Sequence, residues 1–129
     1  MNAEPLVILV EPSPAMQEVL KADLEEEFLC RVVVHASVTN VRKSVIAEPP
    51  ALIVLDIETP AARRFVMDLK DDPDTGAIPV IGANLMGEKS CTDAVEVGYD
   101  SCFTADLRQL ERLARKYLPP RPLQQSLAV

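Results

Sequence analysis

The chain has 129 residues, of which 48% are hydrophobic and 26% are charged, and it carries a formal net charge of −7. This length and composition are typical of one globular domain with a normal hydrophobic core. An acidic surface repels a phosphate backbone, so we do not expect this domain to bind nucleic acid by itself.

Apolar runs alternate with helix-like stretches from the beginning of the chain. The first half predicts strands at Leu6–Val10, 30–35 and 51–55, and helices that begin after Ser13 and near Thr39 or Asn40. Ser13 is expected to cap the first helix, with Pro14 at its first position. The third strand is an unbroken apolar run, which is typical of a strand buried on both faces of a parallel sheet.

The second half continues the alternation. It predicts a helix at about 60–71, a turn at 72–76, a strand at 78–83, a helix at about 89–97, a strand at 100–104 and a last helix capped by Asp106 that extends to about Tyr117. Strands that alternate with helices at this spacing imply β-α-β crossovers and a parallel sheet. The predicted fold class is therefore α/β, a three-layer α/β/α sandwich.

Two parts of the chain are expected to differ in order. Residues 1–118 are predicted to form the domain, and residues 119–129, which contain several prolines, a flexible tail. This tail is compatible with a free end, a linker to an output domain or a docking peptide, and its composition does not choose among them.

The cysteines and apolar segments bear on the compartment. Cys30, Cys91 and Cys102 are widely spaced and form no C-x-x-C pair, which favours reduced thiols over a metal site or a disulfide framework. Leu6–Val10 is too short for a signal sequence or a membrane span. We expect a cytoplasmic protein without a membrane partner.

The most informative residue for function is Asp56, which ends the apolar run of the third strand. Open α/β sheets bind their ligands at the carboxyl ends of the strands. A carboxylate there is suited to accept a phosphoryl group, bind a metal ion or act as a base. It can also simply be capped by neighbouring backbone N–H groups.

Four segments in this order resemble a response-regulator receiver domain of two-component signalling. They are 7–16 with its strand, Ser13 and Pro14; 52–60 with Asp56 and Pro60; 72–81 with Asp72-Pro73 and Ile78-Pro79; and 97–100 with Gly98. The resemblance covers roughly residues 5 to 118. It implies a flavodoxin-like (βα)5 fold with strand order 2-1-3-4-5.

The resemblance also assigns roles to single residues. It implies that Asp56 is the phospho-acceptor and that Mg²⁺ is held by Asp56, an acid at Glu11 and the backbone carbonyl of Glu58. The switch Thr or Ser of the family corresponds to Asn84, and the Lys that pairs with the phosphoryl group corresponds to Ala105.

Three departures from the family pattern weaken this site. Pro12 stands where the family has its direct metal ligand, Ala105 removes the cation, and the loop after Pro60 is shorter and lacks its glycine. Phosphoryl transfer depends on positioning and charge neutralisation. We therefore predict weak Mg²⁺ binding at most, no other cofactor, and impaired phosphorylation. Glu11 itself is expected to be a solvated acid at a strand end.

These features favour a degenerate receiver, or pseudo-receiver, which is a non-enzymatic regulator in a phosphorelay that acts mainly through protein–protein contacts. Its partner would be a histidine kinase, an output domain or another regulator. The resemblance places the contact face, which is also a possible homodimer face, on the fourth helix, fifth strand and fifth helix. The predicted face residues are Tyr99, Phe103, Leu107, Arg108 and Arg112.

Two alternatives remain open. One is a functional receiver that a histidine kinase phosphorylates on Asp56. The other is a flavodoxin-like binder of a nucleotide or flavin, which requires a phosphate-binding loop after the first strand. Residues 11–14 contain no glycine and two prolines, which does not match such a loop.

Overall fold

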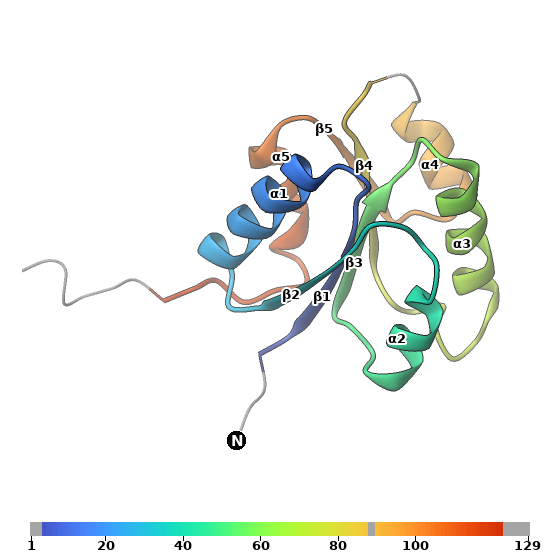
Figure 1. Cartoon of the computed structure of the whole chain (residues 1–129), viewed down its shortest axis with the longest axis horizontal. Coiled ribbons are helices and arrows are strands. Elements are labelled where there is room, and N and C mark those ends of the chain that lie inside the picture. Colours follow the sequence, from blue (N-terminus) through green and yellow to red (C-terminus); the bar gives the residue numbers. More distant parts are fainter. Residues whose placement is uncertain (1–3, 88–89, 123–129) are drawn as a thin grey trace, which may run out of the picture.

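The computed structural model describes residues 4–87 and 90–122, which form a five-stranded parallel sheet covered by helices on both faces (Figure 1). The strand order is β2-β1-β3-β4-β5. The elements in chain order are β1 (Leu6–Val10), α1 (Pro14–Glu27), β2 (Arg31–His35), α2 (Val41–Ala47), β3 (Leu52–Asp56), α3 (Pro60–Asp71), β4 (Val80–Asn84), α4 (Cys91–Val97), β5 (Ser101–Thr104) and α5 (Leu107–Ala114). The predicted flavodoxin-like sandwich with order 2-1-3-4-5 is confirmed.

Side chains of the strands alternate between two apolar clusters, one on each face of the sheet. In β1, Val7 and Leu9 pack in the cluster that contains residues of α1 and α5. Leu6, Ile8 and Val10 pack in the cluster that contains residues of α2, α3 and α4. Every residue of β1, β3 and β4 is buried, because helices cover both faces, as the unbroken apolar runs predicted.

Helix starts follow from local capping. The Ser13 hydroxyl accepts a hydrogen bond from the Met16 amide (3.3 Å), and the Asp106 carboxylate accepts one from the Arg108 amide (2.9 Å). Both predicted caps are confirmed. Thr59 caps α3 in the same way and is followed by Pro60 at the first position, which repeats the arrangement of Ser13 and Pro14.

Some boundaries differ from the predicted ones. Strand β4 begins at Val80 rather than at residue 78, because Pro79 has no N–H to donate to the ladder. Asn84 is the last residue of β4 and does not lie in the following loop. Helix α5 ends at Ala114, short of Tyr117. Lys89, the predicted start of the fourth helix, lies outside the described residues.

The first residues of the predicted tail are held against the domain. The carbonyl oxygen of Pro119 accepts a hydrogen bond from the Leu29 amide (2.9 Å). Arg121 donates its backbone N–H to the Glu27 carbonyl (3.1 Å) and its Nε–H to the Glu25 carbonyl (2.6 Å). Residues 119–121 therefore contact the end of α1 and the loop that follows it, and the flexible tail expected at 119–129 stays a prediction. Residues 123–129 of that segment lie outside the described residues.

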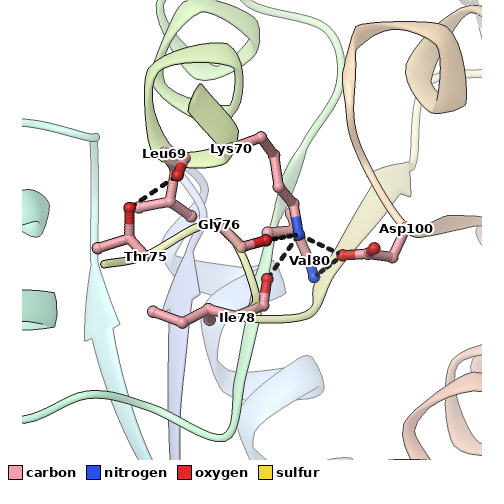
Figure 2. Close-up of polar contacts among 7 residues, drawn as sticks. All are labelled: Leu69, Lys70, Thr75, Gly76, Ile78, Val80 and Asp100. Atoms are coloured by element: carbon pink, nitrogen blue, oxygen red, sulfur yellow. Dashed lines mark hydrogen bonds and ion pairs between the residues drawn. The ribbon is translucent and has the colours of Figure 1, made fainter. Parts of the chain in front are cut away.

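A polar cluster joins the end of α3 to the amino ends of β4 and β5 (Figure 2). The Lys70 ammonium donates to the carbonyl oxygens of Gly76 (3.2 Å) and Ile78 (2.7 Å) and pairs with the Asp100 carboxylate (2.8 Å). The same carboxylate oxygen accepts the Val80 amide (2.7 Å). We call Lys70, Gly76, Ile78, Val80 and Asp100 the amino-edge cluster. It fixes the path of the chain into β4.

Within residues 4–87 and 90–122, none of the helices is long and apolar enough to cross a bilayer.

Candidate functional site

Asp56 lies at the carboxyl end of β3, as the sequence predicts, and is 8% exposed. Its strand is flanked by β1 and β4, and Asp56 is in register with Ala83 of β4. β2 lies on one side of β1, whereas β3, β4 and β5 lie on its other side, so the strand order reverses between β1 and β3. An open α/β sheet binds its ligands at the carboxyl ends of the strands at such a reversal, which is where Asp56 lies.

The Asp56 carboxylate is held by the loop that follows it. Its Oδ2 accepts hydrogen bonds from the backbone N–H groups of Glu58 (3.0 Å) and Thr59 (2.8 Å). The next residues then enter α3 through the Thr59 cap. The backbone-capped arrangement considered from the sequence is therefore present, and the carboxylate shapes the loop between β3 and α3.

Glu11 has a parallel role after β1, and the expectation that it is solvated is wrong. Its side chain is buried, at 5% exposure, and its Oε2 accepts the Ser13 amide (3.0 Å). Burial raises the pKa of the Glu11 carboxyl, the Ser13 hydrogen bond lowers it, and the charge of Asp56 raises it, with a net upward shift. The loop folds inward because this acid supplies an acceptor to the loop's own backbone.

A hollow of about 330 Å³ lies between these two acids. Its lining residues are Glu11, Pro12, Ser13, Met16, Asp56, Glu58, Thr59, Ala83, Leu85 and Met86. Glu11, Asp56 and Glu58 are thus brought to one place, and we call them the carboxyl-edge cluster. Asn84 and Ala105 are not among the lining residues, although Asn84 is buried at the end of β4.

The donors around this hollow fit a magnesium ion poorly. One oxygen of each of Glu11 and Asp56 already accepts a backbone N–H, and Pro12 offers no side-chain ligand. In the described part of the chain, no group of three or more His, Cys, Asp or Glu side chains is arranged to hold a metal ion. Magnesium requires near-octahedral oxygen coordination, which this set supplies only in part.

The loop after β1 also gives little to a nucleotide phosphate. Its Ser13 and Met16 amides already donate to the side chains of Glu11 and Ser13. A phosphate-binding loop needs such amides directed at the ligand. The local hydrogen bonding therefore agrees with the unfavourable sequence of residues 11–14.

Tyr99 is hydrogen-bonded to the backbone of Asp56, a role that the sequence did not indicate. Its hydroxyl donates to the backbone carbonyl oxygen of Asp56 (2.7 Å), and its ring lies beside Gly82 of β4. A Cβ at Gly82 would come within 2.9 Å of the Tyr99 ring and 2.5 Å of Ile57, so only glycine fits there without a shift. Burial raises the pKa of the Tyr99 phenol well above its ordinary value. The residue is a neutral hydrogen-bond donor that fixes the end of β3.

Two members of the predicted contact face are in the core. Tyr99 is 1% exposed and Phe103 is 0% exposed. Phe103 points from β5 into the cluster that contains Leu110 of α5, and Tyr99 packs under α3 and α4. Their assignment to a surface is wrong, because large aromatic side chains at these positions fill the two apolar layers. Leu107 is half-buried, whereas Arg108 and Arg112 are exposed.

Cys91 and Cys102 form a disulfide bond, contrary to the expectation of reduced thiols. Cys91 is the first residue of α4 and Cys102 lies in β5, and the chain reversal between them brings their Cα atoms to 5.5 Å. This separation is normal for a disulfide. The sequence carries one signal for this pair, since the two residues belong to one α-β unit, although their wide spacing favours free thiols. Cys30 is a buried free thiol.

Comparison with solved structures identifies this architecture as that of receiver domains. A signal receiver domain of a histidine kinase from Syntrophus aciditrophicus superposes with a TM-score of 0.74 at 25% identity, over 88% of this chain and 89% of that chain. A receiver domain of a sensor histidine kinase from Pseudomonas aeruginosa, solved with magnesium in its active-site cleft, has a TM-score of 0.76 at 18% identity, covering 89% and 98%.

A third structure, the receiver domain of a DNA-binding response regulator from Colwellia psychrerythraea, has a TM-score of 0.75 at 16% identity over 88% of this chain and 97% of that chain. No protein-family model matches this sequence, and neither does any curated protein. The resemblance to receiver domains inferred from short motifs is thus confirmed at the level of the fold.

Proposed function

We propose that this chain is a pseudo-receiver, a regulatory module of two-component signalling that works through protein–protein contacts in the cytoplasm and catalyses no reaction. In it, Asp56 keeps the position of a phospho-acceptor but serves mainly to shape the loop after β3. The receiver fold supports the signalling context, and the chemistry of the carboxyl-edge cluster supports the loss of efficient phosphotransfer.

The observation that carries this proposal is the bonding of Asp56. Its Oδ2 is already occupied by two backbone N–H groups, and none of the ion pairs in the described part of the chain includes it. The residues at the expected metal-ligand and cation positions, Pro12 and Ala105, are exposed and without charge. A phosphoryl group on Asp56 would therefore lack the metal-binding acid and the cation that are expected to stabilise it in a receiver domain.

We expect this function to require little or no magnesium binding. Glu11, Asp56 and the Glu58 carbonyl would be its ligands, and in each of the two carboxylates one oxygen already accepts a hydrogen bond from its own loop. We expect binding only at millimolar Mg²⁺, through water-bridged contacts.

The contact surface is best supported on α5 and the turn after it. Arg108, Arg112, Arg115 and Lys116 are all exposed there, in a protein whose net charge is −7. A basic surface on an acidic domain favours a partner with a complementary acidic patch. Such a partner is a histidine kinase, an output domain or another regulator, or a second copy of this chain that presents its acidic face.

The test is an amide NMR titration of the protein with Mg²⁺ and beryllofluoride, with Asp56→Asn as the matched control. The proposal predicts that the wild type and the variant respond alike, with no shifts that spread from Asp56 to Asn84. Shifts that begin at Asp56, reach Asn84 and vanish in Asp56→Asn would overturn it. That outcome would establish the alternative of a working phospho-acceptor.

A further inference from the structure

The disulfide between Cys91 and Cys102 joins the first turn of α4 covalently to β5. Cys91 begins α4, and Cys102 lies in β5, which forms one edge of the sheet. Of the seven residues of α4, only Ala94 is buried. Thr92, Asp93, Val95 and Glu96 are exposed. The first turn of α4 is therefore held against the sheet by this covalent bond and by the buried Ala94.

The other end of α4 is anchored differently. Gly98, which ends the helix, lies so near α3 that a Cβ there would be 3.3 Å from the aliphatic part of Lys70 and 3.6 Å from Val66. Lys70 in turn pairs with Asp100, just before β5 (Figure 2). The carboxyl end of α4 is thus held by noncovalent packing and by the amino-edge cluster. If the disulfide opened, the helix would stay attached at this end and gain freedom at its first turn.

Both sulfur-bearing residues are open to reagents in solution. Cys91 and Cys102 are half-buried and line a shallow groove of about 460 Å³, together with Thr92, Val95, Glu96, Asp100 and Ser101. Cys30 offers a contrast within the same chain, since it is 2% exposed and burial raises the pKa of its thiol to about 11. Because the thiolate is the reactive form, Cys30 is protected from exchange.

We infer that Cys91 and Cys102 are a redox-responsive pair, at which a dithiol reductant opens the disulfide and releases the first turn of α4 from β5. This goes beyond the pseudo-receiver function and does not depend on whether Asp56 is phosphorylated. Disulfides in cytosolic proteins are usually redox-sensing or catalytic rather than structural, and this step rests on the cytoplasmic location in the proposed function. The pair is also placed on the α4–β5 part of the fold, so its state changes a surface and leaves the core intact.

The reaction is a thiol–disulfide exchange that balances without any other reactant. A thiolate of the dithiol attacks one of the two sulfurs, forms a mixed disulfide and displaces the other sulfur as a thiolate. The second thiolate of the reductant then attacks its own mixed-disulfide sulfur and releases the second cysteine. Two electrons and two protons pass to the protein, and the reductant becomes a disulfide.

The charge of the groove favours some reductants over others. Glu96 and Asp100 line it, and within the described part of the chain none of its lining residues is basic. Lys70 pairs with Asp100 and neutralises part of that charge, so the exposed Glu96 contributes most of the negative charge that remains at the groove. An anionic thiol such as glutathione is therefore repelled, whereas a cationic thiol such as cysteamine is attracted, and salt screens the difference.

The first experiment counts thiols and follows α4. Alkylation of the denatured, unreduced protein is expected to modify one cysteine, Cys30, and three after treatment with dithiothreitol. Hydrogen–deuterium exchange of the native protein should then show the amides of the first turn of α4 exchanging about tenfold faster after reduction. Cys91→Ser/Cys102→Ser should exchange at the fast rate with or without reductant. Cys30→Ser should behave as the wild type.

Three modified cysteines in protein oxidised with diamide and never reduced would overturn the inference, because the pair would not form in solution. Exchange of α4 that is the same before and after reduction would overturn it as well. A second readout is the rate of reduction per thiolate. This rate should be several-fold higher with cysteamine than with glutathione at low salt. The ratio of the cysteamine rate to the glutathione rate should be smaller in Glu96→Gln. An unchanged ratio in Glu96→Gln would refute the electrostatic selectivity.

Discussion

Two polar clusters lie at opposite ends of the same parallel sheet, and they differ in how their carboxylates are neutralised. In the amino-edge cluster, Asp100 is paired with the Lys70 ammonium and with a backbone N–H of β4. In the carboxyl-edge cluster, Glu11 and Asp56 accept only backbone N–H groups of their own loops in the contacts that the structure describes. In the described part of the chain, the acid of one cluster is thus paired with a cation, whereas Glu11 and Asp56 of the other are held by backbone N–H groups.

The difference also separates two uses of a hydrogen-bonded acid. Asp100 and Lys70 connect segments 30 residues apart, so their interaction stabilises the tertiary fold. Glu11 and Asp56 each bond to residues two or three positions further along the chain. These short-range bonds shape loops and leave the hollow between them lined mainly by apolar residues on its β4 side, Ala83, Leu85 and Met86.

The strongest test of the comparison is to give the carboxyl-edge cluster the charges it lacks. Pro12→Asp/Ala105→Lys should raise the rate of phosphorylation of Asp56 by acetyl phosphate in Mg²⁺ by about 10²–10³-fold, because one acid and one cation are added. Both positions are exposed and leave room for the new side chains. Intact-mass spectrometry measures the rate.

Two controls accompany this variant. Pro12→Asp/Ala105→Met adds the length of a long side chain without its charge and should gain much less. Adding Asp56→Asn should remove all modification. A double variant that reacts no faster than the wild type would show that the missing charges are not what limits the site.

The second test breaks the amino-edge cluster. Lys70→Met keeps the aliphatic stem against Gly98 but removes the ammonium that bonds to Gly76, Ile78 and Asp100. Leaving these acceptors without their donor should lower the free energy of unfolding by about 1–3 kcal/mol. Urea denaturation measures the change. Lys43→Met, at an exposed position of α2, is the matched control and should change stability little. An equal loss in both variants would contradict a specific role for Lys70.

The smallest expected effect concerns pH. The pKa of Glu11 is raised in the folded state, so between its ordinary value of 4.5 and the folded value the native protein binds more protons than the unfolded chain. Stability should therefore fall as pH rises through this window and level off above it. Glu11→Gln, which keeps an acceptor for the Ser13 amide, should flatten the decline in urea denaturation series from pH 4 to pH 8.

A second carboxyl contributes to the same slope and must be separated. Burial and then the neighbouring carboxyl of Glu111 raise the pKa of Asp23 to about 7, with smaller contributions from Glu27 and Glu26. Asp23→Asn alone should leave the Glu11 part of the slope, and the double variant with Glu11→Gln should remove most of it. The opposite outcome is that Asp23→Asn abolishes the dependence of unfolding free energy on pH and Glu11→Gln leaves it unchanged. It would show that ionisation of the carboxyl-edge cluster does not change stability.

The sequence predicted the secondary structure well where the signals were local. The Ser13 and Asp106 caps, the unbroken apolar run before Asp56 and the glycine at the end of α4 all depend on a few neighbouring residues. Predictions that required knowledge of a second element were less reliable. The sequence predicts Tyr99 and Phe103 on a surface, whereas both are buried, and it predicts a solvated Glu11, which is only 5% exposed.

The sequence by itself determined the order of elements, the two-sided burial of the sheet and the place of Asp56 at its carboxyl edge. These follow from periodicity, capping and chain direction, which are properties of contiguous segments. Only the tertiary structure decided that Cys91 meets Cys102, that Tyr99 supports Asp56 and that Lys70 joins α3 to the start of β5. Each of these contacts joins side chains from separate elements, and their distance depends on how helices pack on the sheet, which no local pattern encodes.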